Sequence, residues 1–258
     1  MVAALGNWAH RKVRDYAYAL GYFYQVVRET ALFMRRKQVA FNVLVLQILF
    51  TGVEALTVLA LIALSIGAVI IVEGGSILPR FGQTTLMYNI LIIVITRELG
   101  PLLTAFVIIA RSGTAIATEL GNMVVSHEIE AYVSVGINPI SYLVVPRVLG
   151  VTISVMALTI YFNFFGLIGS FLVAQLINPI PIVEYFRELL RSLQARDIVS
   201  MLVKSFAFGV IIPVVATFQG FKVSASVTEI PRAAIKAVGQ GFVLCFIADA
   251  IITLIYYV

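Results

Sequence analysis

Charged residues are scarce in this sequence. Only 12% of its 258 residues are Asp, Glu, Lys or Arg, whereas 61% are hydrophobic, and the mean hydropathy is +1.03. A soluble domain usually carries about 25% charged residues. Because so few charges could not cover a water-exposed surface, most of the outer surface must face lipid. The composition therefore excludes an ordinary soluble protein and predicts an all-α membrane protein.

Cysteine and histidine are nearly absent. The chain has one cysteine, Cys245, and two histidines, His10 and His127, which excludes an internal disulfide and a metal site built from these residue types. The sequence also contains no G-x-x-x-x-G-K-[ST] phosphate loop, no G-x-S-x-G elbow and no H-E-x-x-H helix. We therefore expect no catalytic residue, metal ion or cofactor in this chain. Any energy it uses must come from a partner or from an ion gradient.

The excess of basic residues does not indicate nucleic-acid binding. The net charge is +5 and the isoelectric point is about 9.4, but the basic residues flank apolar runs and form no patch interleaved with aromatic residues. Before Gln38 they alternate with Trp and Tyr, a mixture that suits a helix lying in the membrane interface.

Five apolar runs are long enough to cross a bilayer. They cover residues 53–72, 86–110, 148–177, 198–218 and 234–257. The stretch before the first of these runs has polar residues at intervals and is followed by Gly52, so we expect an interfacial elbow over residues 39–50. We accordingly divide the chain into an N-terminal interfacial helix and elbow, residues 1–50, and a transmembrane domain, residues 51–258.

The positive charges predict the orientation. Five spans put the two ends of the chain on opposite sides of the membrane. Seven Lys or Arg residues precede Gln38, and five more fall in the loops on that side, against four on the other side. The positive-inside rule then places the N-terminus in the cytoplasm. Residues 181–194 on the outer side have apolar residues at helical spacing, which predicts an amphipathic surface helix.

Four charged residues lie inside the predicted spans beyond their first turn. Arg97 and Glu98 lie in the second span, just before Gly100-Pro101, while Lys204 and Asp249 lie in the fourth and fifth. Because an unpaired charge inside a bilayer costs at least about 2.5 kcal/mol, such residues usually face the interior of a bundle. We predict a Glu98–Lys204–Asp249 cluster with Arg97 nearby. It either lines or gates a pathway, or it only fastens helices together.

The longest polar stretch, residues 111–147, contains a short acidic helix. Residues 127–135 fit one helix that ends at Gly136 and the turn at Asn138-Pro139. On the cytoplasmic side, an acidic helix between two spans is typical of a docking site for a soluble partner. An ordinary connecting helix would give the same pattern, and composition alone leaves both interpretations open.

In order along the chain, these segments resemble the MlaE/YrbE-type permeases of MCE-associated ABC transporters. The residues that carry the resemblance form an ordered set, and it is the order that makes them specific. They are Arg97-Glu98-Leu99-Gly100-Pro101, Ala110-Arg111-Ser112-Gly113, Ala117-Thr118-Glu119-Leu120-Gly121, Glu128-Ile129-Glu130-Ala131, Gly136-Ile137-Asn138-Pro139, Tyr142-Leu143-Val144-Val145-Pro146-Arg147, Lys204-Ser205-Phe206, Gln219-Gly220 and Asp249.

The resemblance implies a homodimeric permease in the bacterial inner membrane. Two cytoplasmic ATPase subunits would supply the energy, with ATP and Mg bound on them, and an MCE-domain protein on the outer side would exchange a phospholipid or similar lipid. The acidic helix would be the element that couples the permease to the ATPase. The residues expected at this coupling site are Arg111, Glu119, Glu128, Ile129, Glu130, Ala131 and Tyr132.

By the same resemblance, lipid would sit in an outward-open pocket at the dimer interface, near the outer end of the first span. That places Ile70, Ile77, Leu78 and Phe81 as its apolar lining. The alternative function is an ion-coupled secondary transporter in which Glu98 and Asp249 titrate. It predicts activity without any ATPase and leaves the acidic helix without a purpose.

Overall fold

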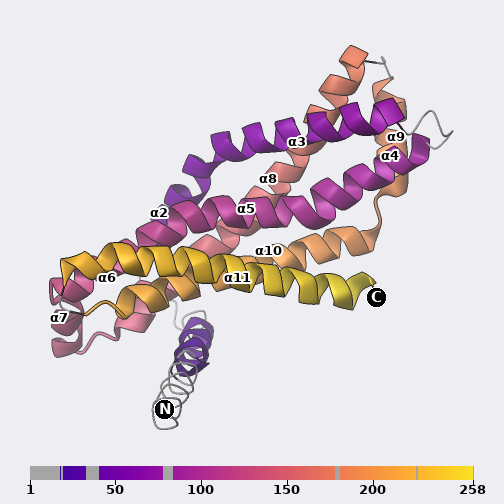
Figure 1. The fold of residues 1–258 in the computed structure, drawn as a ribbon. Coiled ribbons are helices and arrows are strands. Elements are labelled where there is room, and N and C mark those ends of the chain that lie inside the picture. Colours follow the sequence, from indigo (N-terminus) through magenta and orange to yellow (C-terminus); the bar gives the residue numbers. More distant parts are fainter. Residues whose placement is uncertain are drawn as a thin grey trace, which may run out of the picture.

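A computed structural model describes residues 18, 20–32, 41–77, 84–177, 181–224 and 226–257. Within these ranges every regular element is helical, and five helices are long and apolar enough to cross a membrane. The predicted all-α class and the number of spans are confirmed. The long helices run side by side, with α4 and α9 at one end of the bundle and α6 and α7 at the other (Figure 1).

The first span is preceded by a helix that continues into it without a loop. Helix α2 covers Phe41–Gly52, a 3-10 turn follows at Val53–Ala55, and α3 covers Leu56–Ile77. The predicted break at Gly52 is thus a change of helix type, not an interruption. Helix α2 also lies against α8, where Ser154 Oγ donates to the carbonyl of Ile48 over 3.3 Å.

The second span is longer than predicted and is built of five segments. Helix α4 (Thr84–Leu91) leads into a π-helix at Ile92–Leu99, α5 (Gly100–Ile108), a second π-helix at Ile109–Gly113 and α6 (Thr114–Val125). The expected end at residue 110 was wrong. Four residues of α6, Ile116, Ala117, Leu120 and Gly121, are buried, so burial continues the helix past the last apolar run.

The remaining elements follow the predicted order. Helix α7 (Glu128–Ser134) leads to a π-helical turn at Ile140–Val144, α8 (Val145–Ile177) and α9 (Ile182–Ser192). Helix α10 (Ala195–Phe221) is joined by a 3-10 turn at Val227–Glu229 to α11 (Ile230–Tyr257). The predicted third, fourth and fifth spans are confirmed, each slightly extended.

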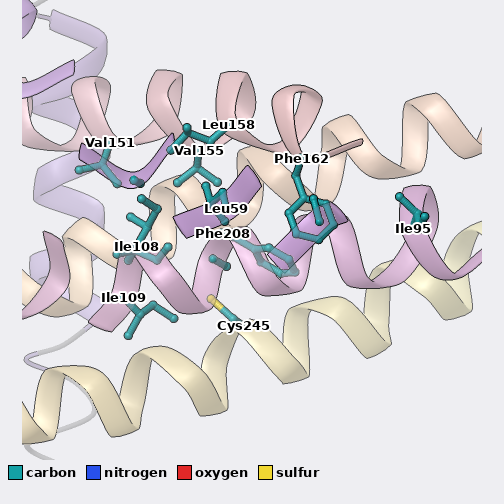
Figure 2. Packing of buried hydrophobic residues seen from close by; sticks show 14 of the residues in the cluster. Leu59, Ile95, Ile108, Ile109, Val151, Val155, Leu158, Phe162, Phe208 and Cys245 are labelled. Atoms are coloured by element: carbon teal, nitrogen blue, oxygen red, sulfur yellow. The ribbon is translucent and has the colours of Figure 1, made fainter. Parts of the chain in front are cut away.

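The core lies where α3, α5, α8, α10 and α11 meet. Leu59, Ile108, Val155, Phe162, Phe208 and Cys245 converge there from these five helices (Figure 2). Small residues allow the helices to approach closely. A Cβ atom added to Gly209 of α10 would lie 2.7 Å from the Cα of Thr152 in α8, so this crossing requires glycine.

The described part of the N-terminal region is a helix over residues 20–32 that lies beside α10 (Figure 1). Tyr22 and Val26 are buried against Val144, Val148 and Val214, and the Tyr22 hydroxyl donates to Thr217 Oγ1 over 2.9 Å. The remainder of the predicted interfacial helix lies outside the described residues.

Helix α9 is amphipathic as predicted, but its apolar face is fixed to the bundle. Tyr185 is fully buried, and its hydroxyl lies 2.7 Å from Ser170 Oγ and donates to the carbonyl of Leu167 over 3.1 Å. Burial raises the pKa of Tyr185 to about 12, so its hydroxyl keeps its proton. The other side of α9 exposes Val183 and Leu190.

Candidate functional site

The charged residues of the second span lie in its first π-helical segment, directly before a proline. Arg97 and Glu98 are the sixth and seventh residues of the segment Ile92–Leu99. Pro101 has no backbone N–H, so it cannot donate to a carbonyl of the preceding turn, which contains Arg97. Lys204 Nζ donates to the carbonyl of Arg97 over 3.1 Å. The fourth span therefore supplies a donor to the backbone of the second span, close to its proline.

Lys204 also joins two carboxylates from different helices. Its Nζ lies 2.7 Å from Glu98 Oε2 and 2.9 Å from Asp249 Oδ1. The side chain of Lys204 is fully buried, whereas Glu98 and Asp249 keep 29% and 12% of their side-chain surface exposed. The structure thus brings together the three residues that the sequence grouped, at the meeting point of the second, fourth and fifth spans.

Arg97 points to a second polar group that the sequence did not predict. Its guanidinium carbon lies 3.3 Å from the centre of the Tyr257 ring, and its Nε lies 3.8 Å from Asp197 Oδ1. The Tyr257 hydroxyl donates to the same Asp197 oxygen over 2.9 Å. Arg97 therefore connects the second span to the start of α10 and the end of α11.

Asp197 was missed because it was assigned to a loop. The structure shows a capping box there, although Gln194-x-x-Asp197 does not match the usual S/T-x-x-E/Q sequence pattern: the Asp197 carboxylate accepts from the backbone N–H of Gln194, and the Gln194 side chain accepts from the Asp197 N–H. This reciprocal pattern marks a helix start. It places α10 three residues earlier than expected and turns Asp197 into the bundle.

Taken together, the two groups contain two cations, Arg97 and Lys204, and three carboxylates, Glu98, Asp197 and Asp249. Buried ion pairs gain little net stability, but removing one partner leaves a charge without compensation. The arrangement therefore fixes the relative position of three helices. Among the described residues, no three His, Cys, Asp or Glu side chains are grouped so that they could hold a metal ion.

The acidic helix is the second candidate site. Helix α7 protrudes from one end of the bundle (Figure 1) and contains no buried residue. Ile129 and Tyr132, three positions apart, pack against the core, and the Tyr132 ring lies 5.4 Å from that of Tyr142. Glu128, Glu130 and Ala131 are exposed. One side of α7 thus anchors it, and the acidic side faces outward.

The two ends of α7 are set by left-handed residues. His127 has a φ of 58° and Gly136 a φ of 78°, and this region is uncommon for residues other than glycine. The His127 Nδ1 lies 3.1 Å from Glu130 Oε2. The predicted helix and its end at Gly136 are confirmed, and two exposed apolar side chains, Val133 and Val135, flank the acidic surface.

Two further residues expected at the coupling site form ion pairs within the chain. Arg111 pairs with Glu54 of the 3-10 turn before α3. Glu119 Oε1 accepts from Arg147 Nη2 over 2.7 Å, and Arg147 also donates to the carbonyl of Leu143. These contacts join the first, second and third spans. The paired residues are far apart in the chain, so the sequence did not predict their pairing.

The residues expected to line a lipid pocket are only partly described. Ile70 is half-buried and packs against the core from α3. Ile77 is the last residue of α3, and Leu78 and Phe81 lie outside the described residues. Helix α3 presents exposed apolar side chains at Leu61, Val69 and Val72, as expected for a surface that meets lipid or another protein.

Comparisons with known proteins place this architecture in a family. Residues 44–255 match the family described as Permease MlaE. A probable ABC transporter permease protein of Rickettsia felis is 26% identical over 257 residues, which cover 100% of this chain and 99% of that protein. A protein of the same description from Rickettsia typhi is 30% identical over 207 residues, 80% of each chain.

A third relative has a more specific name. The intermembrane phospholipid transport system permease protein MlaE of Haemophilus influenzae is 26% identical over 218 residues, 84% of each chain. The matched region begins within α2 and includes helix α7 and all the charged residues of the two polar groups, whereas Tyr257 lies just beyond it. With five membrane-spanning helices in the expected order, the chain belongs to the MlaE permease family.

Proposed function

We propose that this chain is the permease subunit of an ABC transporter that moves phospholipid, or a similar lipid, between the bacterial inner membrane and an MCE-type carrier. The family and the name of the Haemophilus influenzae relative support this substrate class. In the proposed assembly the permease is a homodimer, two ATPase subunits bind its cytoplasmic face, and an MCE-domain protein binds its outer face. The N-terminus lies in the cytoplasm.

Helix α7 is the observation that carries this proposal. It is short, acidic on its outer side, and held to the bundle by Ile129 and Tyr132. Its left-handed boundaries, His127 and Gly136, fix its direction relative to the spans on either side. A rigid helix that contacts its own chain on one side only is suited to transmit a movement of a bound protein to the bundle.

Hydrolysis of ATP is assigned to a separate chain. The 258 residues contain no G-x-x-x-x-G-K-[ST] motif, the element that cradles the phosphates in ATPases of that class. ATP and Mg would therefore bind to the partner subunit. This chain would contribute the docking helix and the lipid path.

The polar groups of the bundle would then keep the second, fourth and fifth spans in register while the dimer opens and closes. Lys204 contacts Glu98 and Asp249 at less than 3 Å, so the three spans would move together. Lipid would bind along the outer end of α3, near Ile70, Ile77, Leu78 and Phe81, where apolar contacts suit acyl chains.

Charge reversal on α7 tests the proposal. In a Glu128→Arg/Glu130→Arg variant, we expect the ATPase subunit to be lost on purification and ATP hydrolysis per permease to fall at least about tenfold, because two favourable contacts become repulsive. Glu184→Arg/Glu188→Arg on α9, at the opposite end of the bundle, is the matched control. An ATPase that stays bound and active in the α7 variant would contradict the docking assignment.

The same purified protein can be used to distinguish the proposed ABC permease from the ion-coupled secondary transporter. If no ATPase accompanies the wild-type chain, lipid transfer by reconstituted vesicles would be measured without ATP. Transfer that persists there and is abolished by Glu98→Gln or Asp249→Asn would support the secondary transporter. Transfer that requires the ATPase and ATP would exclude it.

A further inference from the structure

A cavity of about 890 Å³ lies between the N-terminal helix (residues 20–32), α10 and α11. Its lining residues in these two long helices come from the second half of α10 and the first half of α11. Figure 1 shows that these halves lie towards α6 and α7, away from the end of α3 near α4 and α9, so the cavity is separate from the expected transport pocket. Most of the side chains that line it are apolar, and they come from all three helices. These residues include Leu20, Phe23, Ile211, Val215, Val243 and Leu244.

The size and lining of this cavity fit acyl chains. Ligand pockets of about 300–1,000 Å³ with mainly hydrophobic walls bind drug-sized or lipid-sized molecules. Gly239 of α11 forms part of the wall, and a Cβ atom added there would meet no other atom within 4 Å. The wall is therefore open at the position where α11 has no side chain.

The polar part of the lining is basic. Lys222, just after α10, and Lys236, in the second turn of α11, both line the cavity, and none of its lining residues is acidic. The Lys222 ammonium lies 4.6 Å from the centre of the Phe218 ring. Gln240, one turn after Lys236, accepts from Gln219 over 2.6 Å. Two cations thus border an apolar space.

The position of the cavity matches the edge of a membrane. Lys222 and Lys236 lie at the ends of two spanning helices, next to the loop that joins them. At such ends, lysine side chains reach the headgroup region, and each basic residue near an anionic surface favours binding by about fivefold.

We propose that this cavity binds one anionic phospholipid. Its acyl chains occupy the apolar space between the N-terminal helix, α10 and α11, and its phosphate contacts Lys222 and Lys236. This site is distinct from the transported lipid and does not depend on the proposed transport function. A lipid bound there would hold the N-terminal helix against the bundle, supplementing the bond from Tyr22 to Thr217.

Native mass spectrometry of the purified complex, with either phosphatidylglycerol or phosphatidylcholine added, tests the site. We expect wild type to retain one phosphatidylglycerol per chain more tightly than phosphatidylcholine. In Lys222→Gln/Lys236→Gln, the affinity for phosphatidylglycerol should fall at least about tenfold, towards that for phosphatidylcholine. Arg232→Gln removes a charge one turn before Lys236, outside the cavity lining, and should leave the affinity unchanged.

Gly239→Leu tests the cavity without changing charge. The new side chain enters the open space, so neither phosphatidylglycerol nor phosphatidylcholine should be retained by the variant. Its melting temperature should stay within a few degrees of that of wild type. Phosphatidylglycerol binding that survives Gly239→Leu, or that falls equally in Arg232→Gln, would overturn the proposal. A Gly239→Leu variant that loses no lipid but changes the oligomeric mass would show that a second copy of the chain covers this surface instead.

Discussion

The ammonium of Lys204 donates to the backbone carbonyl of Arg97 over 3.1 Å. This carbonyl lies in the turn before Pro101, a residue that has no backbone N–H to donate. The same ammonium lies against Glu98 and Asp249. One buried side chain therefore bonds a backbone carbonyl of the second span and compensates two carboxylates inside the bundle.

Replacing Lys204 should be the most damaging single change in the bundle. Lys204→Met leaves Glu98 and Asp249 facing each other and the Arg97 carbonyl without this donor. We expect a loss of about 3–5 kcal/mol of folding free energy, the usual cost of removing one partner of a buried ion pair. Denaturant titration of the purified protein in detergent, followed by circular dichroism, would measure it.

Glu98→Gln is the control for this prediction. It keeps Lys204 paired with Asp249, and Glu98 is partly exposed, so the loss should be clearly smaller. Equal losses for the two variants would show that the lysine does not hold the carboxylates together.

Tyr257 should stabilise the bundle through its ring more than through its hydroxyl. Tyr257→Phe keeps the ring under Arg97 and removes the hydroxyl that donates to Asp197, so we expect a loss of about 1 kcal/mol. Tyr257→Leu also removes the cation–π contact, adding up to about 2 kcal/mol. Thermal unfolding of the two variants side by side would give the order; a Phe variant as unstable as the Leu variant would contradict it.

Two helix glycines should respond in opposite directions to the same substitution. Gly209→Ala places a Cβ atom 2.7 Å from the Thr152 backbone, and overpacking of this kind costs about 1–3 kcal/mol. Gly239→Ala meets no atom within 4 Å, so the better helix propensity of alanine should leave stability unchanged or raise it by up to about 1 kcal/mol. Melting temperatures measured in one detergent would compare them.

Glu119 gives a direct test of its expected coupling role. Its partner Arg147 is buried, whereas the Glu119 side chain is 53% exposed. If Glu119 serves only Arg147, Glu119→Gln should lower stability slightly, by up to about 1 kcal/mol, and leave ATP hydrolysis by the complex unchanged. If it contacts the ATPase, hydrolysis should fall at unchanged stability. Measuring both quantities on one preparation distinguishes the two roles.

Only part of the polar cluster could be predicted from the sequence. Because Glu98, Lys204 and Asp249 are charges placed deep inside three different apolar runs, their meeting could be expected from the cost of isolated charges in lipid. Asp197 and Tyr257 could not be added to them, since both lie at helix ends, where a polar residue needs no partner. The continuation of the second span to Val125 was missed for a related reason, because α6 is amphipathic and not uniformly apolar.

The sequence by itself determined that this chain is a helical membrane protein with five spans, a short acidic helix between two of them, and a set of charges that had to find one another. These features follow from the local composition of each segment and from the spacing of its apolar residues, which can be read directly from the sequence. Only the tertiary structure decided that Lys204 donates to Arg97, that Arg97 turns to Tyr257, and that Lys222 and Lys236 border one apolar cavity. Such contacts depend on the rotation and offset of whole helices, which packing of side chains across the bundle sets and no local pattern records.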